Sequence, residues 1–199
     1  MRSPAPISAA VCLAALCLAG CLRSVEVSHS IQPTISLPDK LSEKAGVVCS
    51  DELLSRVERG GAYKIELGEP LCAALVRSVE STYRSAQRAV RPPYKGEFGR
   101  VIRFDLQSAS LGVEHVGGGV VRVTCSISVV VQRFGRDMKP VSSQAAIGNA
   151  LVERSDRADV LVREAAEAAM QQVADNASTL LVAGLGEPRQ HGTGSPAPP

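Results

Sequence analysis

Apolar and polar residues alternate along the segment Val120-Val121-Arg122-Val123-Thr124-Cys125-Ser126-Ile127-Ser128-Val129-Val130-Val131-Gln132. A period of two is typical of a β-strand with one buried face. Such a strand belongs to an antiparallel sheet that is covered on one side only. The apolar side consists of Val121, Val123, Cys125, Ile127, Val129 and Val131, and the polar side of Arg122, Thr124, Ser126, Ser128 and Gln132.

Two further strands are predicted around this segment. Val101–Leu106 alternates in the same way, and Gly117-Gly118-Gly119 predicts a turn between it and the long strand. On the other side, Phe134-Gly135-Arg136-Asp137 predicts a turn, and Val141–Val152 predicts another strand with weaker alternation.

An antiparallel hairpin is predicted nearer the start of the chain. Its first strand begins at Ala45–Cys49 and extends to Leu54 or Val57, and its second strand is Ala62–Leu67. The intervening Glu58-Arg59-Gly60-Gly61 is a turn signal.

Two amphipathic helices are predicted from apolar residues at helical spacing. The first begins near Glu69, with Pro70 in its first turn, and is ended by Pro92-Pro93. The second spans about Arg157–Ala183 and is capped by Asp156. The buried stripe of the first consists of Leu71, Leu75, Val79, Thr82, Ala86 and Val90; that of the second consists of Val162, Ala165, Ala169, Val173, Ala177 and Leu180, with Arg163, Glu167, Gln171 and Asp175 on its solvent side.

Together these elements predict an α+β fold. We expect an antiparallel sheet of four to five strands with both amphipathic helices packed on one face, because that arrangement buries both apolar stripes at once.

The chain starts with a short basic end at Arg2, an uncharged run from Ala5 to Leu18, and Ala19-Gly20-Cys21. Charge, apolar core and small residues are the three parts of a secretory signal. A cysteine directly after Ala-Gly resembles the lipobox of bacterial lipoproteins, in which that cysteine is acylated and becomes the first mature residue. Cys12 and Cys17 follow bulky residues and do not fit; the alternative is an ordinary secretory signal with a chance cysteine.

The lipobox implies a domain organisation. Residues 1–20 are the signal peptide, 21–44 a lipid-anchored flexible tether, 45–184 a single α+β domain and 185–199 a disordered tail. Leu22, rather than aspartate, follows the cysteine, which in such lipoproteins implies the outer membrane, on its periplasmic side.

Charge and motifs exclude several function classes. Removing residues 1–20 leaves 21 basic and 20 acidic residues, which gives no reason to expect nucleic acid as a partner. His29, His115 and His191 share no metal-ligand spacing with Cys, Asp or Glu, and no nucleophile elbow, phosphate loop or zinc-protease motif is present. We therefore expect no cofactor, no metal and no enzymatic activity.

One group of cations is a candidate anion site. Arg77, Arg84, Arg88 and Arg91 fall on neighbouring outward positions of the first predicted helix, where they could hold lipid or lipopolysaccharide phosphates. The alternative is a solvated helix face with cations near its C-terminus, which the helix dipole favours.

Three thiols remain in the mature chain, namely Cys49, Cys72 and Cys125. An oxidising periplasm permits one disulfide. If the hairpin turns near Gly60, Cys49 lies opposite residue 71 and can bond to Cys72, while Cys125 stays reduced among apolar neighbours. Three free thiols, or a Cys49–Cys125 bond, are the alternatives.

The chain resembles the small envelope lipoproteins of the YajG and LPS-assembly LptE type and the auxiliary lipoproteins of envelope lipid-transport systems. The resemblance rests on the lipobox, on Tyr63-Lys64-Ile65-Glu66-Leu67-Gly68-Glu69-Pro70-Leu71, on Gln132-Arg133-Phe134-Gly135-Arg136 and on the Ala-rich last helix. It implies a non-enzymatic accessory that docks on an envelope machine through the polar sheet face or the edge strand. The alternative is a periplasmic lipid or small-ligand carrier, although close packing of the Ala-rich helix makes a small ligand an unfavoured partner.

Overall fold

The computed structural model describes residues 22–89, 93 and 95–183. Two β-sheets and three helices form one mixed α+β unit, so the predicted fold class is correct at that level. The signal peptide, Cys21 and the predicted tail lie outside the described residues, as do Val90, Arg91 and Pro92.

The larger sheet has five strands in the order β5-β2-β6-β7-β8. Its strands are β2 (Leu41–Cys49), β5 (Tyr83–Arg88), β6 (Arg100–Gly117), β7 (Val120–Phe134) and β8 (Pro140–Arg154). The predicted strands on either side of residues 120–132 are thus present, and β6 and β7 are joined by a turn of Gly117–Gly119 with positive φ angles. As predicted from the alternation, β6, β7 and β8 pair antiparallel.

The sheet is mixed rather than wholly antiparallel. Strand β2 lies between β5 and β6 and pairs parallel with both of them. It therefore does not form one arm of a hairpin, as the sequence analysis predicted. A parallel partner needs a long crossover connection, and here helix α3 (Gly68–Thr82) supplies it between β2 and β5.

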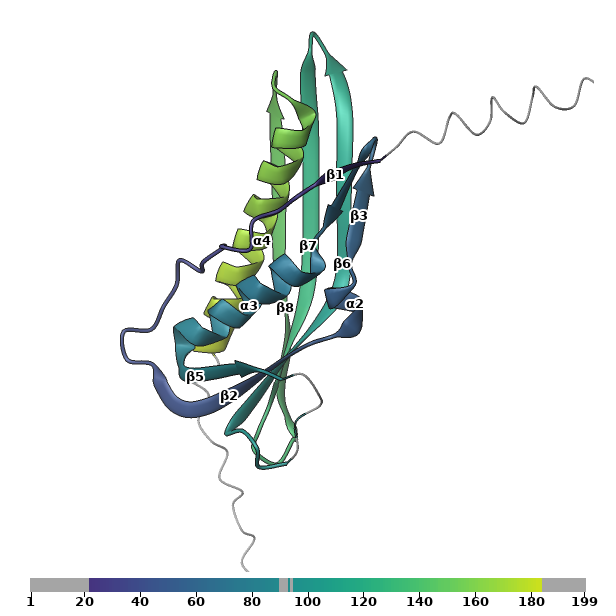
Figure 1. The fold of residues 1–199 in the computed structure, drawn as a ribbon. Coiled ribbons are helices and arrows are strands. Elements are labelled where there is room, and N and C mark those ends of the chain that lie inside the picture. Colours follow the sequence, from purple (N-terminus) through teal and green to yellow (C-terminus); the bar gives the residue numbers. More distant parts are fainter. Residues whose placement is uncertain (1–21, 90–92, 94, 184–199) are drawn as a thin grey trace, which may run out of the picture.

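The hairpin exists in a second sheet, of order β1-β4-β3. Strands β3 (Val57–Gly60) and β4 (Tyr63–Glu66) pair antiparallel around Gly61, whose φ is +54°. A four-residue helix, α2 (Asp51–Leu54), separates β2 from this hairpin and is capped by the Ser50 side chain. The hairpin packs beside the second half of β6, which leads to the β6–β7 turn (Figure 1), and the Gly60 backbone closely approaches Leu111 there.

The two long helices lie together on one face of the five-stranded sheet (Figure 1). Helix α4 (Ala158–Ala183) covers β7 and β8, and α3 packs against it, with the buried Ser78 hydroxyl donating to the Ala174 carbonyl (2.8 Å). Between helices and sheet lies the apolar core, which includes the whole predicted apolar side of β7. Leu181, not the predicted Leu180, is the fully buried residue in the last turn of α4.

Helix α3 ends at Thr82, earlier than predicted. Residues 83–88 are extended because they form β5 along the edge of β2, with Ala86 opposite Ala45. Pairing with a sheet edge satisfies their backbone groups outside the helix and overrides the helical spacing of the apolar residues.

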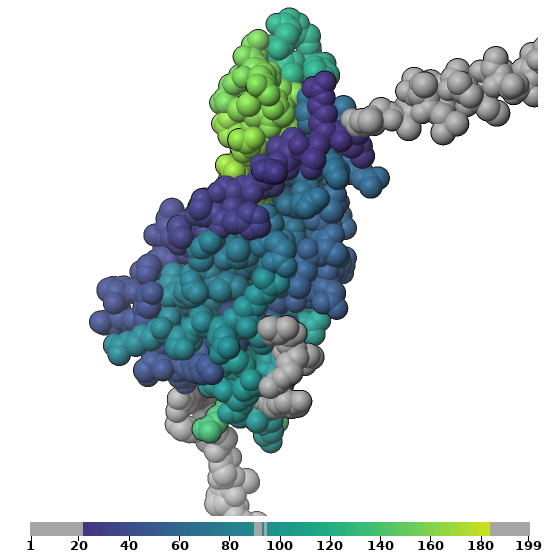
Figure 2. Space-filling view, in the orientation of Figure 1, coloured from purple at the N-terminus to yellow at the C-terminus, as the bar shows by residue number. Residues whose placement is uncertain are grey.

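Residues 22–40, predicted as part of a flexible tether, are packed on the domain. Residues 23–25 form β1 (Arg23–Val25), which pairs parallel with β4, and Val25, Val27 and Ile31 are buried. Figure 2 shows this segment crossing the surface of the molecule. We call residues 22–40 the strap; the folded domain begins with it rather than at residue 45.

Candidate protein-interaction surface

The side of β6, β7 and β8 that faces away from the helices is the open face. The alternation in β7 places Thr124, Ser126 and Gln132 on it, as predicted from the sequence. Strand β8 adds exposed apolar side chains in register, with Leu151 opposite Thr124 and Ile147 opposite Ser128. Leu151 is 64% exposed and Ile147 is 46% exposed. Exposed apolar side chains that gather on one face can mark a binding surface, and these two lie on the same face of β8.

Hydrogen bonds hold the polar groups of the open face in place. The Ser126 hydroxyl donates to Asn149 Oδ1 (2.6 Å), and the Ser128 hydroxyl donates to Gln107 Oε1 (2.9 Å). Near the β6–β7 turn, Arg122 of β7 pairs with Glu153 of β8 at 2.6 Å. The face therefore presents apolar side chains on a rigid, hydrogen-bonded background.

Strand β8 is an edge strand, and an unpaired edge is a template for another strand. Near the middle of β8, backbone groups that point away from the sheet already have hydrogen-bond partners. The Asn149 N–H donates to Gln172 Oε1 (2.9 Å), and Asn176 Nδ2 donates to the Ile147 carbonyl (2.6 Å). Two helix side chains thus take the positions that the peptide groups of a further strand would use. The open face, rather than the middle of the edge, is the surface left for a partner.

Gly148 allows α4 to lie this close to the edge. A Cβ atom at this position would lie 2.0 Å from the Ala169 carbonyl oxygen of α4. Helix and sheet are in direct backbone contact here, which leaves no room for a ligand between them at this point.

The predicted arginine cluster does not form. Arg77 donates to the Ile31 carbonyl (3.0 Å) and so holds the strap. Arg84 and Arg88 are on β5 rather than on a helix, and Arg91 lies outside the described residues. Arg88 is paired with Glu69 at 2.8 Å, which lowers the pKa of the Glu69 carboxyl. The predicted alignment of these arginines on one helix face is therefore wrong, because α3 ends at Thr82.

A disulfide joins Cys49 and Cys72, and their Cα atoms are 6.2 Å apart. The pair is the one expected from the sequence, but the predicted reason for it is wrong. Cys49 ends β2 and Cys72 is in α3, so the bond links a strand to the helix above it, not two arms of a hairpin. Cys125 is a buried free thiol, and burial raises its pKa to about 12.

The side of α4 that was predicted to face solvent is the surface on which the strap lies. The backbone N–H of Ser28 donates to Glu167 Oε1 (2.9 Å), and Gln171 Nε2 donates to the Gln32 carbonyl (2.7 Å). The Thr34 N–H and hydroxyl both donate to Asp175 Oδ1, at 2.6 and 2.9 Å. The spacing of four between the helix residues matches a segment that runs along the helix, a signal that sequence analysis read only as a polar face.

A pocket of about 520 Å³ lies between β1, α2 and the start of α3. Carboxylates from Glu26, Glu66 and Glu69 line it together with His29 and Arg56. Arg56 is engaged with Glu58 and with the Ala109 carbonyl. The surplus of carboxylates makes this pocket unsuited to lipid phosphate.

Residues 22–89, 93 and 95–183 contain neither a grouped metal-ligand set nor a membrane-spanning helix. No three His, Cys, Asp or Glu side chains there are grouped to hold a metal ion. None of the helices there is long and apolar enough to cross a membrane. His115 is exposed near the β6–β7 turn, and His191 is outside the described residues.

The sequence matches no family model and no curated protein. The fold is similar to that of a Xanthomonas campestris protein of the family model DUF330, with a TM-score of 0.54 and 15% identity over 82% of this chain and 97% of that one. A candidate lipoprotein from Caulobacter crescentus gives a TM-score of 0.41 at 14% identity, covering 68% of this chain and 94% of the other. The PelC dodecamer protein from Paraburkholderia phytofirmans gives 0.38 at 11% identity, covering 72% and 93%. The first comparison shows a shared fold; the other two are too loose to support an inference.

Proposed function

We propose that this chain is a lipoprotein, anchored through acylated Cys21 on the periplasmic side of the outer membrane. Its domain is a non-enzymatic accessory of an envelope machine for lipid or lipopolysaccharide transport. The anchor is supported by Leu18-Ala19-Gly20-Cys21 after an uncharged run. Attachment by two or more acyl chains is stable, because each buried CH₂ contributes about 0.8 kcal/mol.

The observation that carries the binding role is the open face. Neither α3 nor α4 covers this side of the antiparallel strands β6–β8, and it exposes Ile147 and Leu151 between hydrogen-bonded polar groups. We propose that an envelope protein docks on this face. Binding through the edge of β8 is disfavoured because Gln172 and Asn176 occupy its central backbone groups.

The test is photo-crosslinking in intact cells. A crosslinking amino acid at Leu151 or Ile147 is expected to trap an envelope protein, whereas one at exposed Glu80, on α3, is not. Leu151→Arg should abolish the crosslink from position 147 without lowering the melting temperature, because the side chain is exposed. Equal crosslinking from all three positions would contradict docking on the open face. Stoichiometric lipid without a protein partner in the purified protein would favour the carrier alternative.

A further inference from the structure

Because the strap is packed on the domain, only a very short connection remains between the proposed anchor and the folded structure. The N–H of Arg23 donates to the Ala62 carbonyl (2.8 Å), and β1 starts at this residue. Cys21 is joined to Arg23 through Leu22 alone, and two residues of extended chain span about 7 Å. If Cys21 carries the lipid, as the proposed function holds, the small sheet β1-β4-β3 must lie at the membrane surface.

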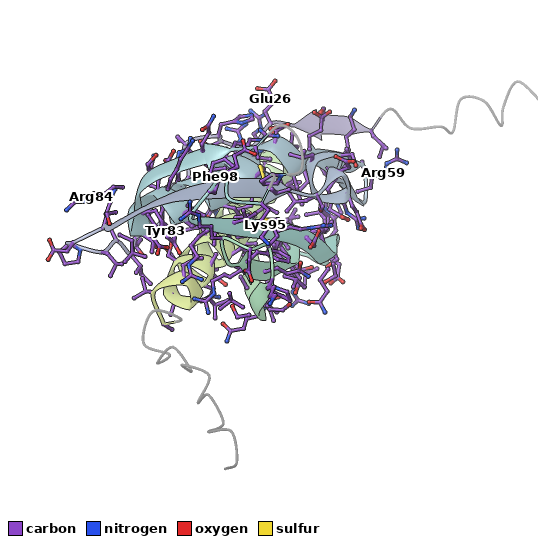
Figure 3. The ribbon with its side chains drawn as sticks, turned by 90° about the horizontal axis from the view of Figure 1, so that it is seen from below. Glu26, Arg59, Tyr83, Arg84, Lys95 and Phe98 are labelled. Carbon is purple, nitrogen blue, oxygen red and sulfur yellow. A yellow bond between two sulfur atoms is a disulfide. The ribbon has the colours of Figure 1, made fainter. Side chains whose placement is uncertain are left out.

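Three cations lie on that part of the molecule. Lys64 of β4 has Ser24 of β1 on one side and Arg59 of β3 on the other, in one row across the small sheet. Arg23 lies one position nearer the chain start. Arg23 and Arg59 are exposed, and Figure 3 shows the Arg59 side chain extending away from the body of the molecule, on the opposite side from Arg84.

These cations differ from the others at the same end. Among the described residues, Arg23, Arg59 and Lys64 are in no ion pair, whereas three neighbouring arginines are neutralised. The paired ones are Arg122 with Glu114 and Glu153, Arg154 with Asp156 and Glu164, and Arg157 with Asp159. Of the carboxylates nearest these cations, Glu58 of β3 is paired with Arg56, and Glu26 and Glu66 line the pocket, away from the β3–β4 turn.

We propose that the turn end of the small sheet is a membrane-contact surface. Arg23, Arg59 and Lys64 bind the anionic phosphate headgroups of the leaflet that holds the acyl chains of Cys21, and Leu22 and Ala62 enter the headgroup layer. The domain is then held in one orientation, with the small sheet facing the membrane. Each cation near an anionic surface raises the equilibrium constant for this docked orientation about fivefold.

The absence of tryptophan from the chain makes this orientation measurable. Single-tryptophan variants of the acylated full-length protein are reconstituted into phosphatidylethanolamine–phosphatidylglycerol vesicles with brominated acyl chains, which quench nearby tryptophan. Leu22→Trp reports the anchor, and Ala62→Trp, in the β3–β4 turn, reports the proposed surface. Val141→Trp, about 40 Å away along the long strands, is the distal control.

The expected result is quenching of the tryptophan at positions 22 and 62 but not at 141. In the Ala62→Trp background, Arg59→Gln with Lys64→Gln should lower the docked equilibrium about 25-fold. The matched pair Arg84→Gln with Lys95→Gln should leave it unchanged. Arg84 lies on the opposite side from Arg59 in Figure 3, and Lys95 precedes Gly96, which is hydrogen-bonded to the turn after β7. Lack of quenching at 22 would contradict the anchor and hence the proposed function. Quenching at 22 without quenching at 62, or equal effects of the two double variants, would overturn the membrane-contact surface alone.

Discussion

At the scale of single residues, position 148 shows how little space separates α4 from the sheet. The strand passes so close to the helix that a methyl group would collide with the backbone at Ala169 rather than with a movable side chain. Backbone atoms cannot give way without shifting a whole element, so the contact sets the distance between helix and sheet.

Gly148→Ala is therefore expected to lower the free energy of unfolding by about 1–3 kcal/mol or more, as overpacking does. Ser143→Ala, exposed on the same strand, is the control and should change it by no more than about 0.5 kcal/mol. Chemical denaturation of both variants measures the difference, and equal midpoints would show that helix and strand separate easily.

The second prediction at this scale concerns Cys125. Burial raises the pKa of its thiol from 9.0 to about 12, so the folded state keeps a proton that the unfolded state loses. This thiol's contribution to stability is fully present below pH 9 and is lost as the pH rises toward 12. The wild type should thus lose stability in this window more steeply than Cys125→Ala. Parallel curves for the two proteins from pH 8 to 11 would contradict the assignment.

At the scale of elements, the strap is held by the buried side chains of Val25, Val27 and Ile31 and by polar contacts with α4. Its bonds to Glu167, Gln171 and Asp175 are hydrogen bonds on a partly exposed surface, each of which contributes about 1 kcal/mol. Residues 32–40 include no buried side chain, and segments with few buried apolar contacts open locally without global unfolding.

Asp175→Ala removes both hydrogen bonds from Thr34. It should raise the hydrogen-exchange rate of the strap's backbone amides around Thr34 about fivefold or more. Glu80→Ala, on the exposed side of α3, serves as the matched control. Mass-resolved hydrogen exchange checks the effect, which should spare the core strands. Uniformly faster exchange across the domain would show that the strap belongs to the global folding unit.

At the scale of the whole molecule, the domain is elongated along β6 and β7, and the strap starts at its side, beside the β3–β4 hairpin (Figure 1). Attachment at Leu22 would hold the domain by the small sheet and place the turn between β7 and β8 far from the anchor along the strands.

Cys21→Ser is expected to leave an unacylated protein that no longer fractionates with membranes, because the acyl chains supply most of the proposed membrane affinity. The folded domain should be unchanged in melting temperature. Mass spectrometry of the native protein checks the same point, since an unmodified Cys21 would end the lipoprotein interpretation.

The strands β6–β8, helix α4 and the polar side of β7 followed from the sequence, because burial on one face leaves a local period of two or 3.6 residues. The outward position of Ile147 and Leu151 did not, since β8 carries apolar residues at both odd and even positions.

Only the tertiary structure decided the placement of β2 between β5 and β6, the end of α3 at Thr82 and the seat of the strap on α4. These depend on pairings between distant segments, such as Ser28 with Glu167, 139 residues apart. A strand edge and a polar helix face have the same local sequence pattern whether water or another segment of the chain forms hydrogen bonds with them. The sequence pattern therefore determined which surfaces are polar, and the fold determined which of them the chain itself covers.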